Sequence, residues 1–171
     1  MCSCVYFDAD TACVRSDCSD MVLDPETMSR SVIFVVSLAA LQVAHQVGDH
    51  VIQSDRQAAD KADARRVGRA AATRAMAGHL LGYHLCALVI LIGTALVLRL
   101  PLHPGGVALA IGFSAVTHAL LDLRWPVRAL LRATGAPRFA EATTPVCGLY
   151  AADQALHRLA LLISALLLAT A

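Results

Sequence analysis

Four stretches of this chain are long and apolar enough to cross a lipid bilayer, and they constrain the fold more than any other feature. They run over residues 31–53, 75–98, 105–123 and 149–171, and each reaches the roughly 17 to 25 residues that a spanning helix needs. With 57% hydrophobic and 16% charged residues, the chain is too apolar for a soluble domain of this size. The sequence predicts an all-α polytopic membrane protein, with a four-transmembrane-helix bundle over residues 31–171.

Residues 1–30 form a separate acidic segment that contains four of the six cysteines, namely Cys2, Cys4, Cys13 and Cys18. Their spacing matches no standard zinc pattern, although a disulfide pair or a small metal knuckle stays open. The segment resembles no cleavable signal. It is interpreted either as a disordered acidic tail or as residues upstream of a native start at Met28.

The positive charges gather in two connections, residues 54–74 and 124–148. These hold ten of the fourteen Lys and Arg residues: Arg56, Lys61, Arg65, Arg66, Arg69, Arg74, Arg124, Arg128, Arg132 and Arg138. The positive-inside rule places both connections in the cytoplasm, which leaves both termini outside. A net charge of +1 without a nucleic-acid motif argues against a nucleic-acid partner. The lipid bilayer is the expected partner, and a homo-oligomer stays open.

Histidine and aspartate recur at helical spacing within the apolar stretches. In three of them a histidine and an aspartate stand four residues apart, so that both side chains share one helix face. The second stretch has two histidines five residues apart, of which one is expected to point at the common centre. The cluster comprises His45, Asp49, His79, His84, His118, Asp122, Asp153 and His157.

The depth of these residues in the membrane brings them together. At 1.5 Å per residue, all of them fall within about 5 to 15 Å of the cytoplasmic edge. Imidazole and carboxylate are ligands of Zn, Mn and Fe, and a helix bundle can hold one such ion or a pair. The sequence predicts a site for one or two divalent metal ions towards the cytoplasm.

A plainer interpretation is that His/Asp pairs only join the helices by hydrogen bonds. Three pairs and a fourth histidine-bearing helix at one depth favour a functional site instead, because an ionised side chain within a bilayer is costly. Candidate catalytic residues are Asp49, Asp122 and Asp153. Residues expected to support the ligands or to bind substrate are Gln53, Gln154 and Arg158.

The expected function is that of a metal-dependent hydrolase, because a bound metal ion generates a hydroxide nucleophile near neutral pH. Its substrate would be a lipid or another amphipathic molecule near the cytoplasmic leaflet. One alternative is a transporter of divalent metal or protons, or a metal-sensing module. A di-iron oxidative membrane enzyme is the other alternative, since the same ligands would serve it.

At these residues the sequence resembles a bacterial membrane family known as domain of unknown function 3307. That family shows a histidine, Gly-Asp, an aromatic residue and a glutamine in its first helix, a histidine in its second, then His-x-x-x-Asp and a late Asp-Gln-x-x-His. The matching residues here are His45, Gly48, Asp49, Gln53, His79 or His84, His118, Asp122, Asp153, Gln154 and His157.

This resemblance covers about residues 31–171 and implies a place in the bacterial cytoplasmic membrane, but no activity. The chain departs from the pattern at His50, which stands where the family has its aromatic residue, and in the irregular spacing of His79 and His84. A looser similarity to membrane-bound metal-dependent hydrolases, in helix count and His/Asp content, favours hydrolysis by analogy.

Overall fold

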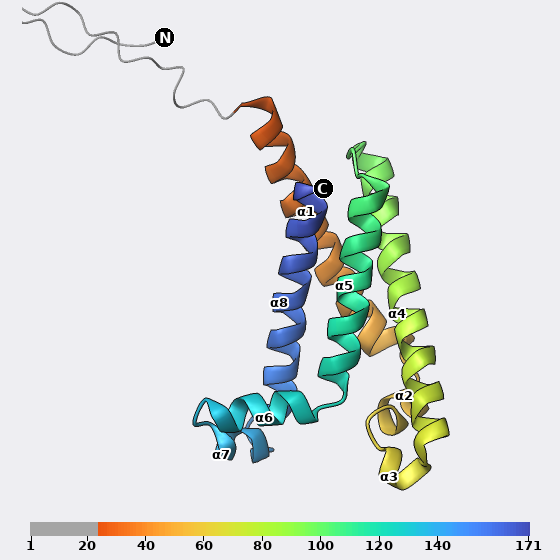
Figure 1. Cartoon of the computed structure of the whole chain (residues 1–171), viewed down its shortest axis with the longest axis vertical. Coiled ribbons are helices and arrows are strands. Elements are labelled where there is room, and N and C mark those ends of the chain that lie inside the picture. Colours follow the sequence, from red (N-terminus) through yellow and green to blue (C-terminus); the bar gives the residue numbers. More distant parts are fainter. Residues whose placement is uncertain (1–23) are drawn as a thin grey trace, which may run out of the picture.

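The computed structural model describes residues 24–171, and within this range the chain is helical and contains no strand (Figure 1). The long helices are α1 (Pro25–Val47), which the π-helix η2 (Gly48–Ile52) continues, α4 (Arg69–Leu98), α5 (Pro104–Asp122) and α8 (Gly148–Thr170). All four are long and apolar enough to cross a membrane, which confirms the predicted all-α four-helix membrane bundle. Residues 1–23, with Cys2, Cys4, Cys13 and Cys18, lie outside the described range.

Small side chains let the long helices approach one another closely. Helix α8 packs against α1 and α5, and α1 packs against α4. The interior is rich in alanine, which allows the close backbone approach typical of membrane bundles; its buried alanines include Ala40, Ala44, Ala87, Ala95, Ala110 and Ala165. Large apolar side chains such as Leu81, Leu96 and Val97 are exposed on the outside. This distribution suits a surface that faces lipid.

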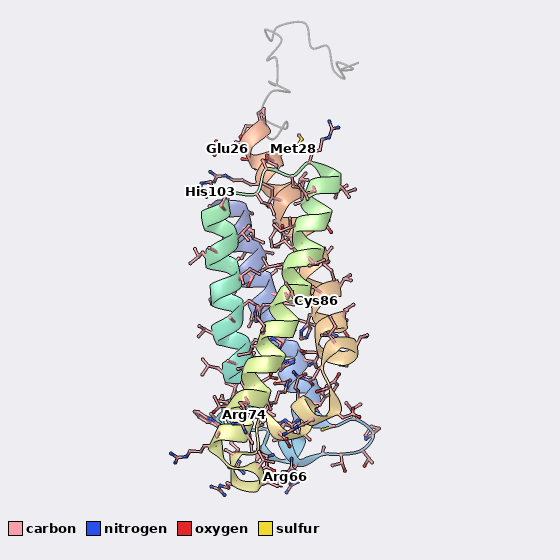
Figure 2. The ribbon with its side chains drawn as sticks, turned by 90° about the vertical axis from the view of Figure 1, so that its right-hand side faces the viewer. Glu26, Met28, Arg66, Arg74, Cys86 and His103 are labelled. Carbon is pink, nitrogen blue, oxygen red and sulfur yellow. The ribbon has the colours of Figure 1, made fainter. Side chains whose placement is uncertain are left out.

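Four short helices occupy the two basic connections, at one end of the bundle (Figure 1). They are α2 (Asp55–Asp60), α3 (Ala64–Val67), α6 (Trp125–Ala133) and α7 (Pro137–Glu141). Figure 2 shows Arg66 and Arg74 at this end, and Glu26, Met28 and His103 at the opposite end. Helix α6 is amphipathic, with Val127 fully buried and Trp125 exposed. This arrangement suits a helix lying at a membrane surface.

Local signals set the ends of these helices. Asp24 caps α1 through the backbone N–H of Thr27, at 2.9 Å, and Ser54 forms a capping box with Gln57 at the start of α2. Gly68 has a φ of 81°, and α4 begins directly after it, at Arg69 rather than at the predicted residue 75. The helix extends beyond the apolar stretch because its backbone continues to the nearest helix-breaking residue.

A π-helical turn forms the end of the first spanning helix, where the polar residues of that helix lie. In η2 the backbone N–H of Gln53 bonds to the carbonyl of Gly48 at 3.1 Å, so the hydrogen bonds run i to i+5. Such turns change the direction of the following side chains and occur frequently at functional sites. The regular α-helical spacing predicted for residues 45–53 therefore holds only up to the start of η2.

Gly48 is required where η2 meets α4. A Cβ atom at this position would lie 2.6 Å from Cδ2 of Tyr83, whose side chain is fully buried and cannot move aside. Gly48→Ala is therefore expected to destabilise the bundle by about 1–3 kcal/mol through overpacking. The measurement is the apparent Tm of the detergent-purified protein.

Gly93→Ala is the matched control, because a Cβ atom at Gly93 would meet nothing within 4 Å. It should leave the Tm unchanged or raise it slightly, since alanine favours helix. Equal Tm values for wild type and Gly48→Ala would contradict the packing described here.

Candidate metal centre

Four histidines, one from each long helix, have buried side chains in the half of the bundle next to α2 and α6. They are His45 of α1, His79 of α4, His118 of α5 and His157 of α8, with exposed fractions of 0%, 2%, 2% and 2%. Two carboxylates, Asp49 and Asp122, contact the same group of rings. The layer predicted from depth along the helices is thus present as side-chain contacts.

Two imidazole nitrogens lie side by side, and an oxygen of each carboxylate approaches both of them. Nε2 of His79 and Nε2 of His118 are 2.9 Å apart. Oδ2 of Asp122 lies 3.2 Å from the first nitrogen and 3.4 Å from the second, and Oδ1 of Asp49 lies 3.4 Å from both. Donors about 2.0–2.1 Å from a tetrahedral zinc ion are about 3.3 Å from one another. The distances from the two nitrogens to each carboxylate oxygen are of the size that a tetrahedral site requires, and His79, His118 and Asp122 form one group that could hold an ion.

Several buried polar atoms in this region lack a hydrogen-bond partner among residues 24–171: Oδ1 of Asp49, Oδ1 of Asp153 and Nε2 of His157. Leaving a polar atom buried and unpaired costs about 1–3 kcal/mol, and more when the group is charged. Carboxylate oxygens can only accept when ionised. The unpaired oxygens therefore favour a ligand that is a cation or a proton donor.

Hydrogen bonds orient two of the rings so that a lone pair faces the centre. Nδ1 of His157 donates to the backbone carbonyl of Asp153 at 2.9 Å, which leaves Nε2 as an acceptor in the neutral ring. Nε2 of His45 donates to Oε1 of Gln154 at 3.2 Å, so its Nδ1 carries the lone pair, 3.4 Å from Oδ2 of Asp49. Partners of this kind fix the tautomer of ligating histidines.

Three overlapping groups of residues can each hold a metal ion, with ligand atoms within 4.8 Å of one another. The first is His45, Asp49 and His118, the second is His79, His118 and Asp122, and the third is Asp122, Asp153 and His157. Because His118 and Asp122 each belong to two groups, the cluster is continuous. Its size is compatible with one ion or with two neighbouring ions.

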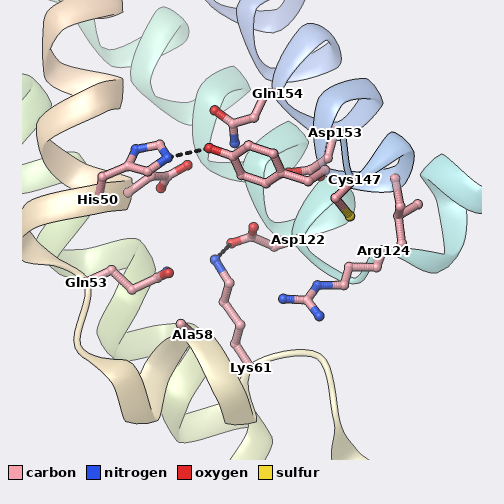
Figure 3. A pocket seen from close by; sticks show the side chains of 12 residues that line it. His50, Gln53, Ala58, Lys61, Asp122, Arg124, Cys147, Asp153 and Gln154 are labelled. Atoms are coloured by element: carbon pink, nitrogen blue, oxygen red, sulfur yellow. Dashed lines mark hydrogen bonds and ion pairs between the residues drawn. The ribbon is translucent and has the colours of Figure 1, made fainter. Parts of the chain in front are cut away.

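A pocket of about 360 Å³ opens beside this cluster. Figure 3 shows it between η2, α2 and the start of α8. Asp49, Asp122 and Asp153 line it together with Lys61 and Arg124. The carboxylates that contact the histidines are therefore also accessible to a small molecule.

Comparison with known proteins identifies the family. Residues 37–171, more than half of the chain, match the family described as Protein of unknown function (DUF3307). The chain belongs to this family. No curated protein and no solved structure matches it. The predicted family is confirmed, whereas the looser similarity to hydrolases has no support from these comparisons.

The remaining predicted site residues of this DUF3307 chain occupy different surroundings. Gln53 reaches Nδ1 of His79 at 2.7 Å, and Gln154 contacts His45. His84 lies apart from the three groups, with Nδ1 bonded to the carbonyl of Leu80 and Nε2 3.2 Å from the hydroxyl of Ser114. Arg158 is exposed in a shallow groove with Gln42 and Gln46, away from the pocket.

Two residues of the site were not predicted from the DUF3307 pattern. Tyr83 lies among the histidines, with its ring centroid 4.1 Å from that of His118 and its hydroxyl 3.3 Å from Nδ1 of His45. Its position four residues after His79, on the same helix face, is the signal that could have identified it. Lys61 is buried, and its Nζ lies 2.7 Å from Oδ2 of Asp122. It is the only lysine in the chain.

The Lys61–Asp122 ion pair is expected to be energetically coupled. Lys61→Met should destabilise the protein by about 3–5 kcal/mol, because a buried carboxylate then loses its cation. Added to Asp122→Asn, the same change should cost less, which gives a coupling energy of about 0.5–3 kcal/mol in a double-mutant cycle measured by chemical unfolding.

The exposed pair Arg66–Asp63 provides the comparison, with Nε of Arg66 3.2 Å from Oδ2 of Asp63. Its cycle should show little coupling, because water screens exposed charges. Additive effects of Lys61→Met and Asp122→Asn would show that the buried contact does not contribute to stability.

Proposed function

We propose that this DUF3307 protein binds divalent metal within the membrane and is a metal-dependent hydrolase of a lipid or another amphipathic substrate. One observation carries the proposal: Nε2 of His79 and Nε2 of His118 lie 2.9 Å apart, and an oxygen of Asp49 and one of Asp122 each lie 3.2–3.4 Å from both nitrogens. Zn, Mn and Fe are the metals that this ligand set favours. Among residues 24–171, all the groups of His and Asp that could hold a metal ion belong to this one continuous cluster.

The residues divide into ligands and a proton acceptor. We assign His79, His118 and Asp122 to the first ion, together with Asp49, which contacts both rings. His45 lies beside Asp49. Asp153 lies outside this set of four, lines the pocket and has one buried oxygen without a partner. We assign it as the general base. His157 and Asp122 can join it around a second ion.

A divalent ion held by these residues would polarise a water molecule or an ester oxygen. In the proposed reaction Asp153 takes a proton from the attacking water as the oxygen of that water bonds to the ester centre. The bond from this centre to the leaving oxygen then breaks, and Asp153 returns the proton to the leaving group. Water is the only co-reactant, so the step balances as a hydrolysis.

The surroundings of the pocket support an amphipathic substrate. Ala58, Leu149 and Tyr150 line it, and exposed Val51 lies on the adjoining η2. The amphipathic α6, with exposed Trp125, lies at the same end of the bundle. A molecule with a polar head and an apolar tail would meet polar groups in the pocket and apolar side chains next to it.

The apolar half of the bundle argues against the alternative of a transporter. Beyond the site the helices pack through a core that includes Leu41, Leu91, Ala110, Leu161 and Leu168. A path for ions would need polar groups there. A metal-sensing module would need no such path and is distinguished by a lack of turnover. The third group, which contains Asp122, Asp153 and His157, supports the di-iron alternative, because it shares Asp122 with the second group.

The variants separate the assigned roles. In detergent-purified protein we expect stoichiometric metal by elemental analysis, and strong loss of metal in Asp49→Ala and His118→Ala. Asp153→Asn should retain the first ion but lower kcat by about 100- to 10,000-fold, as expected for loss of a general base. The substrates are p-nitrophenyl butyrate, p-nitrophenyl phosphate and bis-p-nitrophenyl phosphate in mixed micelles.

His103→Asn is the control, because His103 lies at the opposite end of the bundle and caps α5, a role that asparagine can fill. It should keep both metal and turnover. Wild type that holds metal but hydrolyses none of the three substrates would refute the hydrolase, and wild type without metal would refute the site as well. Iron with an oxygen-sensitive absorption band would favour the oxidative alternative.

We propose further that the site faces the cytoplasm of a bacterial cell, with both termini of the chain outside. The support is the basic character of the connections at the site end (Figure 2), which the positive-inside rule assigns to the cytoplasm. Alkaline phosphatase fused after Ala171 should be active, and the same reporter fused after Gly135 should be inactive. The opposite pattern would reverse the orientation.

A further inference from the structure

Two cations line the pocket, Lys61 at the C-terminal end of α2 and Arg124 in the turn between α5 and α6 (Figure 3). The charged group of Lys61 is buried against Asp122, as described above. The guanidinium of Arg124 forms no ion pair with another residue in the range 24–171. A neutral substrate would need neither cation.

The backbone holds Arg124 in place. Its φ is 62°, in the left-handed region that residues other than glycine rarely adopt, and this costs about 1–3 kcal/mol. Its N–H bonds to the carbonyl of Leu121 at 2.8 Å, and α6 begins at the next residue with Pro126 in its first turn. The backbone position of Arg124 at the pocket is therefore fixed by α5 on one side and α6 on the other.

Charge determines when the pocket attracts an anion. Three carboxylates, Asp49, Asp122 and Asp153, face two cations, Lys61 and Arg124, which leaves a net charge of −1 with neutral histidines. One divalent ion changes this to +1, and a second ion changes it to +3. An anionic group should accordingly bind only after the metal.

We propose that the substrate carries a phosphate group, which binds between Arg124, Lys61 and the metal. This inference rests on the proposed function and specifies its substrate class. Phosphate has enough oxygens to meet all three partners, since a guanidinium can bind two of them and an ammonium binds as a point charge. A carboxylic ester is uncharged and offers the two cations nothing comparable.

The phosphate belongs either to a lipid headgroup or to a soluble molecule. A pocket of about 360 Å³ can take a headgroup, and apolar Leu149 together with Tyr150 forms part of its wall. The hydroxyl of Tyr150 donates to Nε2 of His50 at 2.6 Å and joins η2 to α8 at the pocket. The acyl chain of such a lipid would extend out of the pocket along Leu149 and Tyr150.

The test uses protein loaded with stoichiometric Mn²⁺ in an uncharged maltoside detergent, with inorganic phosphate as the probe. Bound Mn²⁺ should broaden the ³¹P resonance of the phosphate, and protein without metal should not. Arg124→Gln is expected to raise the apparent Kd about 10-fold, the loss typical of charge-assisted hydrogen bonds. Arg138→Gln removes an equal charge from exposed α7 and should stay within about twofold of wild type.

Two competitors distinguish the sources of the phosphate. If dioctanoyl phosphatidic acid displaces inorganic phosphate at far lower concentration than glycerol 3-phosphate does, the ligand is a lipid headgroup. Equal displacement by the two indicates a soluble phosphate. Both results support the phosphate site.

Metal content, measured on the same samples, separates the two possible failures. Protein that retains Mn²⁺ but leaves the phosphate resonance sharp would overturn the phosphate inference and leave the metal site standing. The same holds if Arg124→Gln and Arg138→Gln bind phosphate equally well. Protein that retains no Mn²⁺ would overturn both the inference and the proposed function.

Discussion

Carboxylates within a membrane-spanning bundle must be compensated by neighbouring groups, and the structure depends on this constraint. The side chains of Asp49 and Asp122 are largely buried inside the bundle, and an uncompensated charge there is expensive. Compensation comes from the other helices, because His79 of α4 and His118 of α5 contact both carboxylates. Lys61 from the connection between α1 and α4 adds a full positive charge. The polar layer thereby joins elements that are far apart in the sequence.

The two halves of the bundle are built differently. The half near the start of α1 and the end of α8 packs through apolar side chains such as Leu41 and Leu161. The other half holds the histidines, the pocket and the short helices. A site that is dry on one side and open on the other suits chemistry on a molecule that arrives from the membrane surface. It suits movement across the membrane poorly.

The sequence was sufficient to predict the four spanning helices and the convergence of their polar residues. Both predictions rest on strong periodic signals: apolar length, and pairs such as His118 and Asp122 four residues apart. The π-helical turn that begins at Gly48 could not be predicted, because the i to i+4 spacing of its polar residues is typical of an ordinary α-helix. Lys61 was missed because it lies in a charged connection, where a buried lysine looks like any solvated one.

Arg158 shows that a residue next to a site residue in the sequence need not lie in the site. It follows His157 directly and was predicted to support the site, yet successive residues on a helix point about 100° apart. The structure places Arg158 on the outside with Gln42, while Arg124, distant in sequence, lines the pocket. Residues at helix ends are set by the turn geometry there, which the apolar pattern does not encode.

X-ray absorption at the zinc edge of the zinc-loaded protein tests whether histidines and aspartates of the bundle hold the metal ion. We expect a shell of nitrogen and oxygen at about 2.0–2.1 Å, with outer-shell scattering from at least two imidazoles that is diminished in His118→Ala. A sulfur shell at about 2.3 Å, which would indicate cysteine ligands, or a shell without imidazole would contradict a centre built from His79, His118, Asp49 and Asp122.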